Sequence, residues 1–247
     1  MALAAKVSSS ELTAQVTNRF VDAYFEARLI NAPGTSYTPG ITDDTSFLSF
    51  AVTPGTGGYY PQSIGYTSGD VLAYSDDGVP LNTKSTIFAH DGGATAIDFS
   101  HVALVWTSGV TTAIGGVDSA PSAGVNGTYT NILQSSSSGS GTGLMINITV
   151  TNSGATAGDY AVTLSNGGTG YVAAEAIVFT AADLITAGVC PSGATGSLAF
   201  AVSTVSSPGP DEGNILAVAQ TTNAVTLTGG NEAVFYWNLK QFGYYAV

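Results

Sequence analysis

The sequence predicts a mainly β protein: a β-sandwich or jelly-roll-like domain with an N-terminal helix, followed by a second, glycine-rich β module. The composition is typical of strands joined by tight turns, because many Thr, Ser, Ala and Val residues accompany 31 glycines among 247 residues. Hydrophobic residues make up 44%, which is enough to bury a core and too many for a disordered chain. Short apolar segments also alternate with glycine-rich turns along most of the chain.

One long helix is predicted over residues 9–29. Ser8 and Glu11 have the spacing of a capping box, in which each side chain satisfies a free backbone N–H at the helix start. Leu12, Val16 and Phe20 then recur at helical spacing on one face. We expect this face to lie on a sheet or between subunits, so Leu12, Val16 and Phe20 are candidate interface residues.

The first domain is predicted to contain strands over residues 47–52, 86–89 and 95–107. The turn at 90–93 carries Asp-Gly and Gly-Gly, which allow the positive φ angles of a tight hairpin, so we expect the second and third strands to pair. From Val102 onward both faces of the third strand carry apolar residues. This pattern predicts a strand that is covered on both sides.

A change of composition predicts the domain boundary. Residues 115–127 are rich in Gly, Ala and Ser and are interpreted as a linker. We therefore predict an N-terminal domain over 1–118, which 214–247 can complete, and a glycine-rich β module over 119–213. In the module we expect strands at 128–133, 144–151, 160–164 and 197–205, a helical turn after the capping pair Thr180 and Asp183, and a flexible surface tip at 135–143.

Aromatic residues mark further candidate interface positions. Phe235 and Trp237 share one stripe of a predicted strand over 233–240, and Val234 and Tyr236 share the other. Tyr59 and Tyr60 follow a Gly-rich turn. Aromatic side chains supply large buried areas, so Phe235, Trp237, Tyr59 and Tyr60 are expected in the core or at an interface.

The charge balance excludes some partners. Five Lys and Arg stand against 17 Asp and Glu, a formal net charge of −12. A nucleic-acid binder needs cations to displace phosphate counterions, and an anionic membrane surface attracts basic segments, so neither partner is expected. Charged residues make up only 9%, against about a quarter in an average chain. This favours a subunit whose surface is covered by neighbours, and an acidic secreted protein remains the alternative.

The sequence carries no pattern typical of a targeting segment, and it has one cysteine. The first residues lack the long apolar stretch of a signal peptide, and no run approaches the length of a membrane helix. We therefore expect the chain to stay in the cytosol until it assembles. Cys190 is the single cysteine, so no internal disulfide can form, and its small-residue context indicates a buried apolar filler.

No catalytic, cofactor-binding or metal site is expected. His90 and His101, the two histidines, could approach each other across the predicted hairpin, but a zinc site needs three or four such ligands. Ser and Asp residues are common, yet no nucleophile-elbow motif occurs. Three acidic pairs, Asp43–Asp44, Asp76–Asp77 and Asp211–Glu212, lack the spacing of a calcium loop and are interpreted as turn residues, with calcium at Asp43 and Asp44 as the lesser alternative.

Two groups of segments show a family resemblance. Residues 47–60, 64–67 and 97–104 resemble small phage and prophage virion proteins with an N-terminal helix, a Gly-Gly-Tyr strand entry and a late strand of the F-S-H-V-A-L type. Residues 127–132 (GTYTNI) and 167–171 (GGTGY) are similar to a glycine-rich β module of phage fibre and appendage proteins. The motifs are of moderate specificity, and the resemblance carries no catalytic residues.

The resemblance implies a structural protein of a tailed-phage virion, assembled in the host cytoplasm. The leading expectation is a capsid decoration (cement) protein: a homo-oligomer, expected to be a trimer, that binds other virion proteins and stabilises the shell through its N-terminal helix. The alternative is a tail fibre, baseplate or adhesin subunit. A polysaccharide-degrading tail enzyme, with Tyr59, Tyr60 and Tyr66 lining a sugar cleft, is the third hypothesis.

The scarcity of Lys and Arg predicts resistance to trypsin. The chain offers only five cleavage sites. If packing or neighbouring subunits cover these sites, we expect the native protein to survive a trypsin treatment that degrades the urea-unfolded protein, as followed by gel electrophoresis. Rapid cleavage of the native protein would show that the sites are exposed and mobile.

Overall fold

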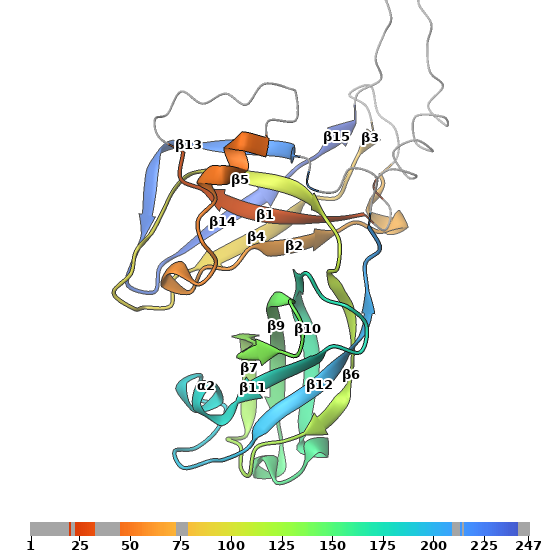
Figure 1. Cartoon of the computed structure of the whole chain (residues 1–247), viewed down its shortest axis with the longest axis vertical. Coiled ribbons are helices and arrows are strands. Elements are labelled where there is room, and N and C mark those ends of the chain that lie inside the picture. The colour runs from red at the N-terminus through yellow and green to blue at the C-terminus, as the bar shows by residue number, and fades with distance from the viewer. Residues whose placement is uncertain are drawn as a thin grey trace, which may run out of the picture. The chain divides into compact units, whose positions relative to one another are not determined.

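The computed structural model describes residues 20, 23–32, 45–72, 79–208, 213 and 215–241 (Figure 1). The chain is mainly β, with 53% of the described residues in strands and 12% in helices, which confirms the predicted fold class. It divides into two compact units. Unit 1 is Met1–Tyr60, Ile64–Trp106 and Gly213–Val247, and unit 2 is Pro61–Ser63 and Thr107–Glu212.

Unit 1 is built around a four-stranded sheet and a two-stranded ribbon. The sheet has the order β13 (Ile215–Leu227), β5 (Ile97–Thr107), β1 (Tyr24–Ile30), β2 (Gln62–Gly65). The ribbon pairs β4 (Lys84–Ala89) with β14 (Glu232–Trp237), and β3 (Val79–Pro80) with β15 (Lys240–Gln241). A bond from the Leu81 amide to the Leu239 carbonyl (3.0 Å) links the two short ladders.

The predicted hairpin does not form, although both of its strands exist. β4 pairs with β14 and β5 pairs with β13, so the chain crosses from the ribbon to the sheet at residues 90–96 and crosses back at 228–231. Phe88 and Phe99 both pack on Phe235, at 6.0 and 5.9 Å between ring centroids. Burial of these rings between the ribbon and the sheet therefore outweighs the local preference of the glycine turn for a hairpin.

Strand β5 is covered on both sides, as predicted. Its Phe99, Val102 and Leu104 lie in the core between sheet and ribbon, while Ala103 and Val105 pack on the opposite face beneath Phe47. The alternation of a regular strand is broken at Ser100 and His101, both buried, where the inward-facing positions change from odd to even numbers. A buried Phe or Leu stabilises the fold by about 1.5–3 kcal/mol, so this strand is a main source of stability.

Two predictions near the N-terminus are wrong. Residues 24–29, assigned to the long helix, belong to β1, because Phe25, Ala27 and Leu29 alternate inward at the period of a strand. The rest of the predicted helix lies outside the described residues, apart from Phe20, which has helical backbone, and Ala23, which is neither helix nor strand. The strand predicted at 47–52 is the 3₁₀ helix η1 (Thr45–Phe50), which places Phe47 over β5.

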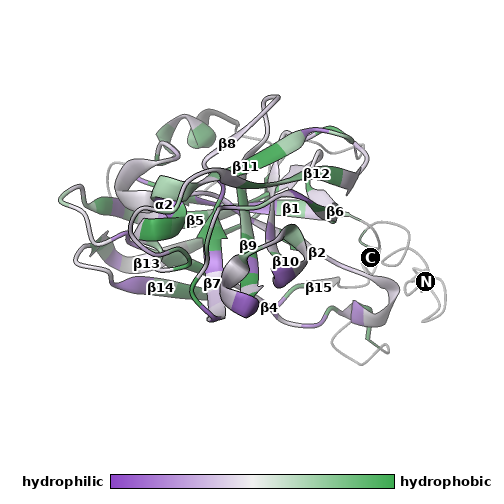
Figure 2. Ribbon diagram, turned by 90° about the horizontal axis from the view of Figure 1, so that it is seen from below, coloured by the Kyte–Doolittle hydropathy of each residue, from purple (hydrophilic) through white to green (hydrophobic). Residues whose placement is uncertain are grey.

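Unit 2 is a sandwich of two antiparallel sheets around one core. One sheet has the order β10 (Tyr160–Thr169), β9 (Thr142–Val150), β7 (Gly127–Leu133), and the other has the order β6 (Thr111–Ser119), β12 (Ser197–Val205), β11 (Ala176–Thr180), β8 (Ser136–Ser137). Ile146 and Ile148 of β9 meet Phe179 and Phe200 of the second sheet in this core. Figure 2 shows the green, hydrophobic residues along strands such as β9.

The strands predicted in the glycine-rich module are present, with longer bounds for β9 and β10. The predicted helical turn is α2 (Ala181–Thr186), where the Thr180 hydroxyl accepts a bond from the Asp183 amide. The remaining short helices are η2 (Thr56–Gly58), η3 (Ser68–Asp70), η4 (Asn152–Gly154) and η5 (Ala157–Asp159).

The boundary between the units lies at residues 106 and 107 and not at 118. Residues 111–119, partly assigned to a linker, form β6, which pairs with β12 of unit 2. The described C-terminal strands belong to unit 1. The composition change near residue 115 therefore reflects an exposed, glycine-containing strand, since β6 is mostly solvent-facing.

The Ser- and Gly-rich segment 135–143 is held in place by two side chains. Tyr171 packs directly on Gly141, and its hydroxyl accepts a bond from the Leu144 amide (3.0 Å) and donates one to Gln134. The Glu175 carboxylate accepts bonds from the amides of Gly141 and Val172, each at 3.0 Å. Small residues are needed here beneath the tyrosine ring. The segment predicted to be a flexible surface tip is mostly exposed, and it is anchored at Gly141.

We expect Gly141→Ala to destabilise unit 2. The added Cβ would lie 1.9 Å from the Tyr171 ring, so the ring must move and the free energy of unfolding should fall by about 1–3 kcal/mol. Gly116→Ala is the matched control, because its Cβ meets nothing within 4 Å, and it should change stability by about 0.5 kcal/mol or less. Urea unfolding followed by far-ultraviolet circular dichroism measures both. Equal midpoints for the two variants would contradict the packing described.

Candidate functional site

Most of the predicted interface residues that the structure describes pack inside unit 1. Phe20, Tyr59 and Trp237 are buried there, and Phe235 is half-buried against the same core. Tyr60 is half-buried, and Leu12 and Val16 lie outside the described residues. The aromatic stripes of the sequence thus indicate core positions more than an exposed surface.

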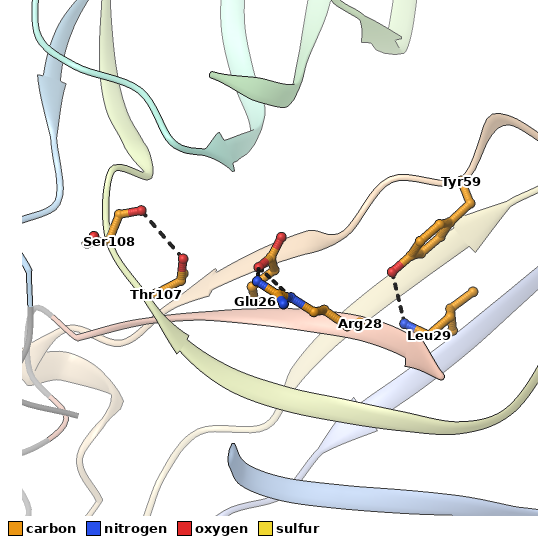
Figure 3. Close-up of polar contacts among 6 residues, drawn as sticks. All are labelled: Glu26, Arg28, Leu29, Tyr59, Thr107 and Ser108. Carbon is orange, nitrogen blue, oxygen red and sulfur yellow. Dashed lines mark hydrogen bonds and ion pairs between the residues drawn. The ribbon is translucent and has the colours of Figure 1, made fainter. Parts of the chain in front are cut away.

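Tyr59 has a specific structural role. Its hydroxyl accepts a hydrogen bond from the Leu29 backbone amide at 2.9 Å (Figure 3). Burial raises the pKa of this phenol well above its usual value, and the bond from Leu29 opposes only part of that rise. Tyr59 therefore stays neutral and ties the loop after η2 to the central strand β1.

The two histidines are engaged at separate places in unit 1. His90 is buried at the crossing between β4 and β5, where its Nδ1 accepts from the Gly92 amide (2.9 Å). Its Nε2 lies 2.8 Å from the Thr95 carbonyl, so this nitrogen carries the proton. His101 packs edge-on against Phe47, and its Nδ1 lies 2.9 Å from the Ser100 hydroxyl. The hairpin expected to bring the two rings together is absent.

A carboxylate on the opposite face of β1 from the main core is paired with a cation. Glu26 is buried, and its Oε2 accepts from Arg28 Nε at 2.8 Å and Nη2 at 2.5 Å (Figure 3). The residues are two apart on a strand and therefore share one face. The arrangement neutralises a buried acid and leaves Arg28 partly exposed.

Asp70 joins three segments of unit 1. Its side chain caps η3 through the amide and hydroxyl of Thr67, at 2.8 and 3.0 Å, and its Oδ1 accepts from Lys84 Nζ at 2.8 Å and from Asn82. The Thr67-x-x-Asp70 spacing is typical of such a helix start. Burial alone would raise the pKa of Asp70, but the bonds from Lys84, Thr67 and Asn82 outweigh it and lower the pKa to about 2.

Two carboxylates serve the same purpose in unit 2. The bonds that Glu175 accepts from Ser137, Val172 and Gly141 outweigh the effect of its burial and lower its pKa. Asp159 caps η5 through Thr156 and accepts from Asn152, which also lowers its pKa. These acids therefore hold loops in their own unit.

The remaining candidate ligands are the three acidic pairs of the sequence. All six residues of the three acidic pairs lie outside the described residues. Among the residues that the structure does describe, no group of three His, Cys, Asp or Glu side chains could hold a metal ion. No helix in that part of the chain is long and apolar enough to span a membrane. Cys190 is buried in the core of unit 2, and burial raises the pKa of its thiol.

The outward face of the ribbon exposes an apolar surface that the sequence did not single out. We call it the ribbon face, and it consists of Ser85, Ile87 and Ala89 of β4 with Glu232, Val234 and Tyr236 of β14. Ile87 is 43% exposed, Val234 39% and Tyr236 74%. Sheets with one face to water usually place polar residues outward, so this face departs from the rule. The signal was the second apolar stripe of residues 233–240.

Comparison with known proteins finds no relative: no family model, no curated protein and no solved structure matches this chain.

We expect Asp70→Asn to destabilise unit 1 by about 1–2 kcal/mol at neutral pH, because the variant loses the ion pair with Lys84. The effect is no larger because Lys84 is one-third exposed and solvent partly screens the pair. The pKa of Asp70 is lower in the folded chain than its ordinary value of 3.8. The stabilisation is therefore present above about pH 4 and lost as the pH falls toward the folded-state value.

Urea midpoints of wild type and Asp70→Asn, measured from pH 7 to pH 2.5 by tryptophan fluorescence, should converge in acid. Trp106 and Trp237, the two tryptophans, both belong to unit 1. Asp118→Asn alters an exposed carboxylate in β6 and serves as the control. A constant difference between wild type and Asp70→Asn across this range would exclude the charge on Asp70 as its cause.

Proposed function

We propose that this chain is a structural protein of a tailed-phage particle, and that it acts as a capsid decoration protein that binds the shell and stabilises it. The observation that carries the proposal is the use of its ionic groups. The buried acids Glu26, Asp70, Asp159 and Glu175 hold cations or loops of their own unit, while a nearly uncharged apolar face is left exposed. Such a molecule is suited to packing against neighbours and not to catalysis.

Loops that are fixed by hydrogen bonds support a role in stabilising a shell. In unit 2 the segment 135–143 is fixed by Tyr171 and Glu175. In unit 1 the crossings between ribbon and sheet are joined by a bond from the His90 amide to the Asn231 carbonyl at 2.9 Å. Loops fixed in this way cost little additional ordering entropy when the protein binds a surface.

The assignment to a virion rests on the sequence resemblance. Both motifs of the glycine-rich module lie in unit 2, where GTYTNI forms most of β7 and GGTGY spans the end of β10 and the residues after it. Gly168 and Gly170 in the second motif have positive φ, which explains the glycines in the pattern. The partners we propose are the major capsid protein and further copies of this chain.

A tail appendage remains the second candidate. The observation in its favour is Val172, which is 62% exposed beside the fixed segment 135–143. A rigid tip with an exposed apolar residue is suited to contact with a host surface.

The test of the N-terminal anchor is a deletion that leaves the fold intact. Removal of residues 1–30 would delete β1, whose Phe25, Ala27 and Leu29 are fully buried, and would therefore disturb the β core as well. Removal of residues 1–18 keeps β1 and Phe20, so it is the variant that separates anchoring from folding.

The decisive measurement is the number of copies per particle. We expect hundreds of copies in purified virions, counted by quantitative mass spectrometry against the major capsid protein, and loss of the chain from virions when residues 1–18 are removed. A handful of copies would favour the tail candidate. Absence from particles made by the phage that encodes the chain would overturn the proposal.

A further inference from the structure

We infer that the ribbon face joins two copies of this chain around a twofold axis. The inference deepens the proposed function, because it names the surface through which copies associate. It is argued from the composition, charge and register of the face.

The ribbon face is apolar where an exposed sheet is ordinarily polar. Val234 lies directly opposite Ile87 in the ladder, and Tyr236 lies opposite Ser85, so the three large apolar side chains are neighbours. The inward residues of the same strands, Phe88 and Trp237, are buried against the core, which fixes the outward direction of the others. A continuous apolar surface of this kind marks an interaction site.

Charge favours this face over more acidic surfaces for a contact between two copies. The chain carries a formal net charge of −12, so two copies repel each other over most orientations. The ribbon face has a single charged residue, Glu232, at one end. Two copies that meet at this face bury apolar area and bring only these two carboxylates near the contact.

The register makes the face complementary to itself. A twofold axis in the interface, perpendicular to the strands and level with Val234 and Ile87, stacks each strand on its own copy in the opposite direction. Val234 then meets Val234, Ile87 meets Ile87, and Glu232 lies opposite Tyr236 of the second copy, whose hydroxyl can donate to the carboxylate. An axis along the strands would instead bring the two Glu232 carboxylates to the same end, where they repel.

A twofold contact predicts an even number of copies in the free protein. The smallest assembly is a dimer, and the trimer expected from the sequence would become a hexamer if it forms through another face. The face is small beside a standard interface of about 20–30 residues a side, so we expect an association that depends on concentration.

The test is the mass of the full-length protein, measured by size-exclusion chromatography with light scattering over a dilution series. Wild type should reach an even number of copies. Val234→Asp places two carboxylates against each other on the axis, so the dissociation constant should rise about 100-fold or more and the mass should halve. Val125→Asp adds the same charge at a site in unit 2 that is 42% exposed, and it should leave the mass unchanged.

Tyr236→Ser is the second variant, in case Val234→Asp fails to fold. It removes apolar area without adding charge, and circular dichroism checks its fold.

Val234→Cys gives an independent readout, because Cys190 is the only native cysteine and is buried. A bis-maleimide cross-linker with a short spacer, which forms a thioether with each thiol, should join two chains at position 234, because packed sheets lie about 10 Å apart. It should not join them at Val125→Cys, an exposed site in unit 2.

Wild type that is monomeric or trimeric at every concentration, or a mass that Val234→Asp and Tyr236→Ser leave unchanged, would overturn the inference. Monomeric wild type whose binding to virions is lost in Tyr236→Ser would overturn it too, since the face would then bind the particle. The copy count in virions tests the proposed function separately. A monomer present in hundreds of copies refutes the twofold contact alone, and an even-numbered oligomer absent from virions refutes the function alone.

Discussion

The stability of unit 1 depends on two long-range strand pairs. The consecutive strands β4 and β5 pair with β14 and β13, which lie far away in the sequence. β13 pairs with β5 and β14 pairs with β4, so Ile97 lies opposite Leu227 and Phe88 opposite Ala233. All of unit 2, except residues 61–63, lies in the chain between these partners. Closing so long a loop costs conformational entropy that grows only slowly with length, and the aromatic core around Phe99 and Phe235 supplies the burial that offsets it.

The crossings between ribbon and sheet follow from the same constraint. Each long-range pair must enter and leave the core at the same end, so the connections at 90–96 and 228–231 lie together and His90 bonds to both. The imidazole accepts from the Gly92 and Gly230 amides and donates to the Thr95 carbonyl, so a single side chain links the two connections. A histidine beside Asp-Gly-Gly, which can suggest a reactive site, is here an organising element of the fold.

The few charged residues and the many glycines of this protein both help to hold its loops in place. Acids that are buried are paired or accept several N–H bonds, as Asp70 and Glu175 do, which avoids the cost of an isolated buried charge. Glycines such as Gly141 allow a tyrosine ring to approach the backbone closely and so fix a loop without apolar side chains. In the described part of the chain, a few buried acids therefore hold loops through hydrogen bonds, which is consistent with the structural role that we propose.

The sequence by itself determined the features that depend on neighbouring residues. The caps at Thr67 and Thr180 need only a partner three positions along the chain, and the strands of unit 2 are bounded by local glycine turns. The tertiary structure alone decided which strands pair, that Phe25, Ala27 and Leu29 alternate in a strand in place of the predicted helix, and that Tyr59 and Trp237 are core while Tyr236 is exposed. The reason is that these outcomes depend on burial between segments distant in sequence, and a local pattern carries no information about which of its two apolar stripes finds a partner.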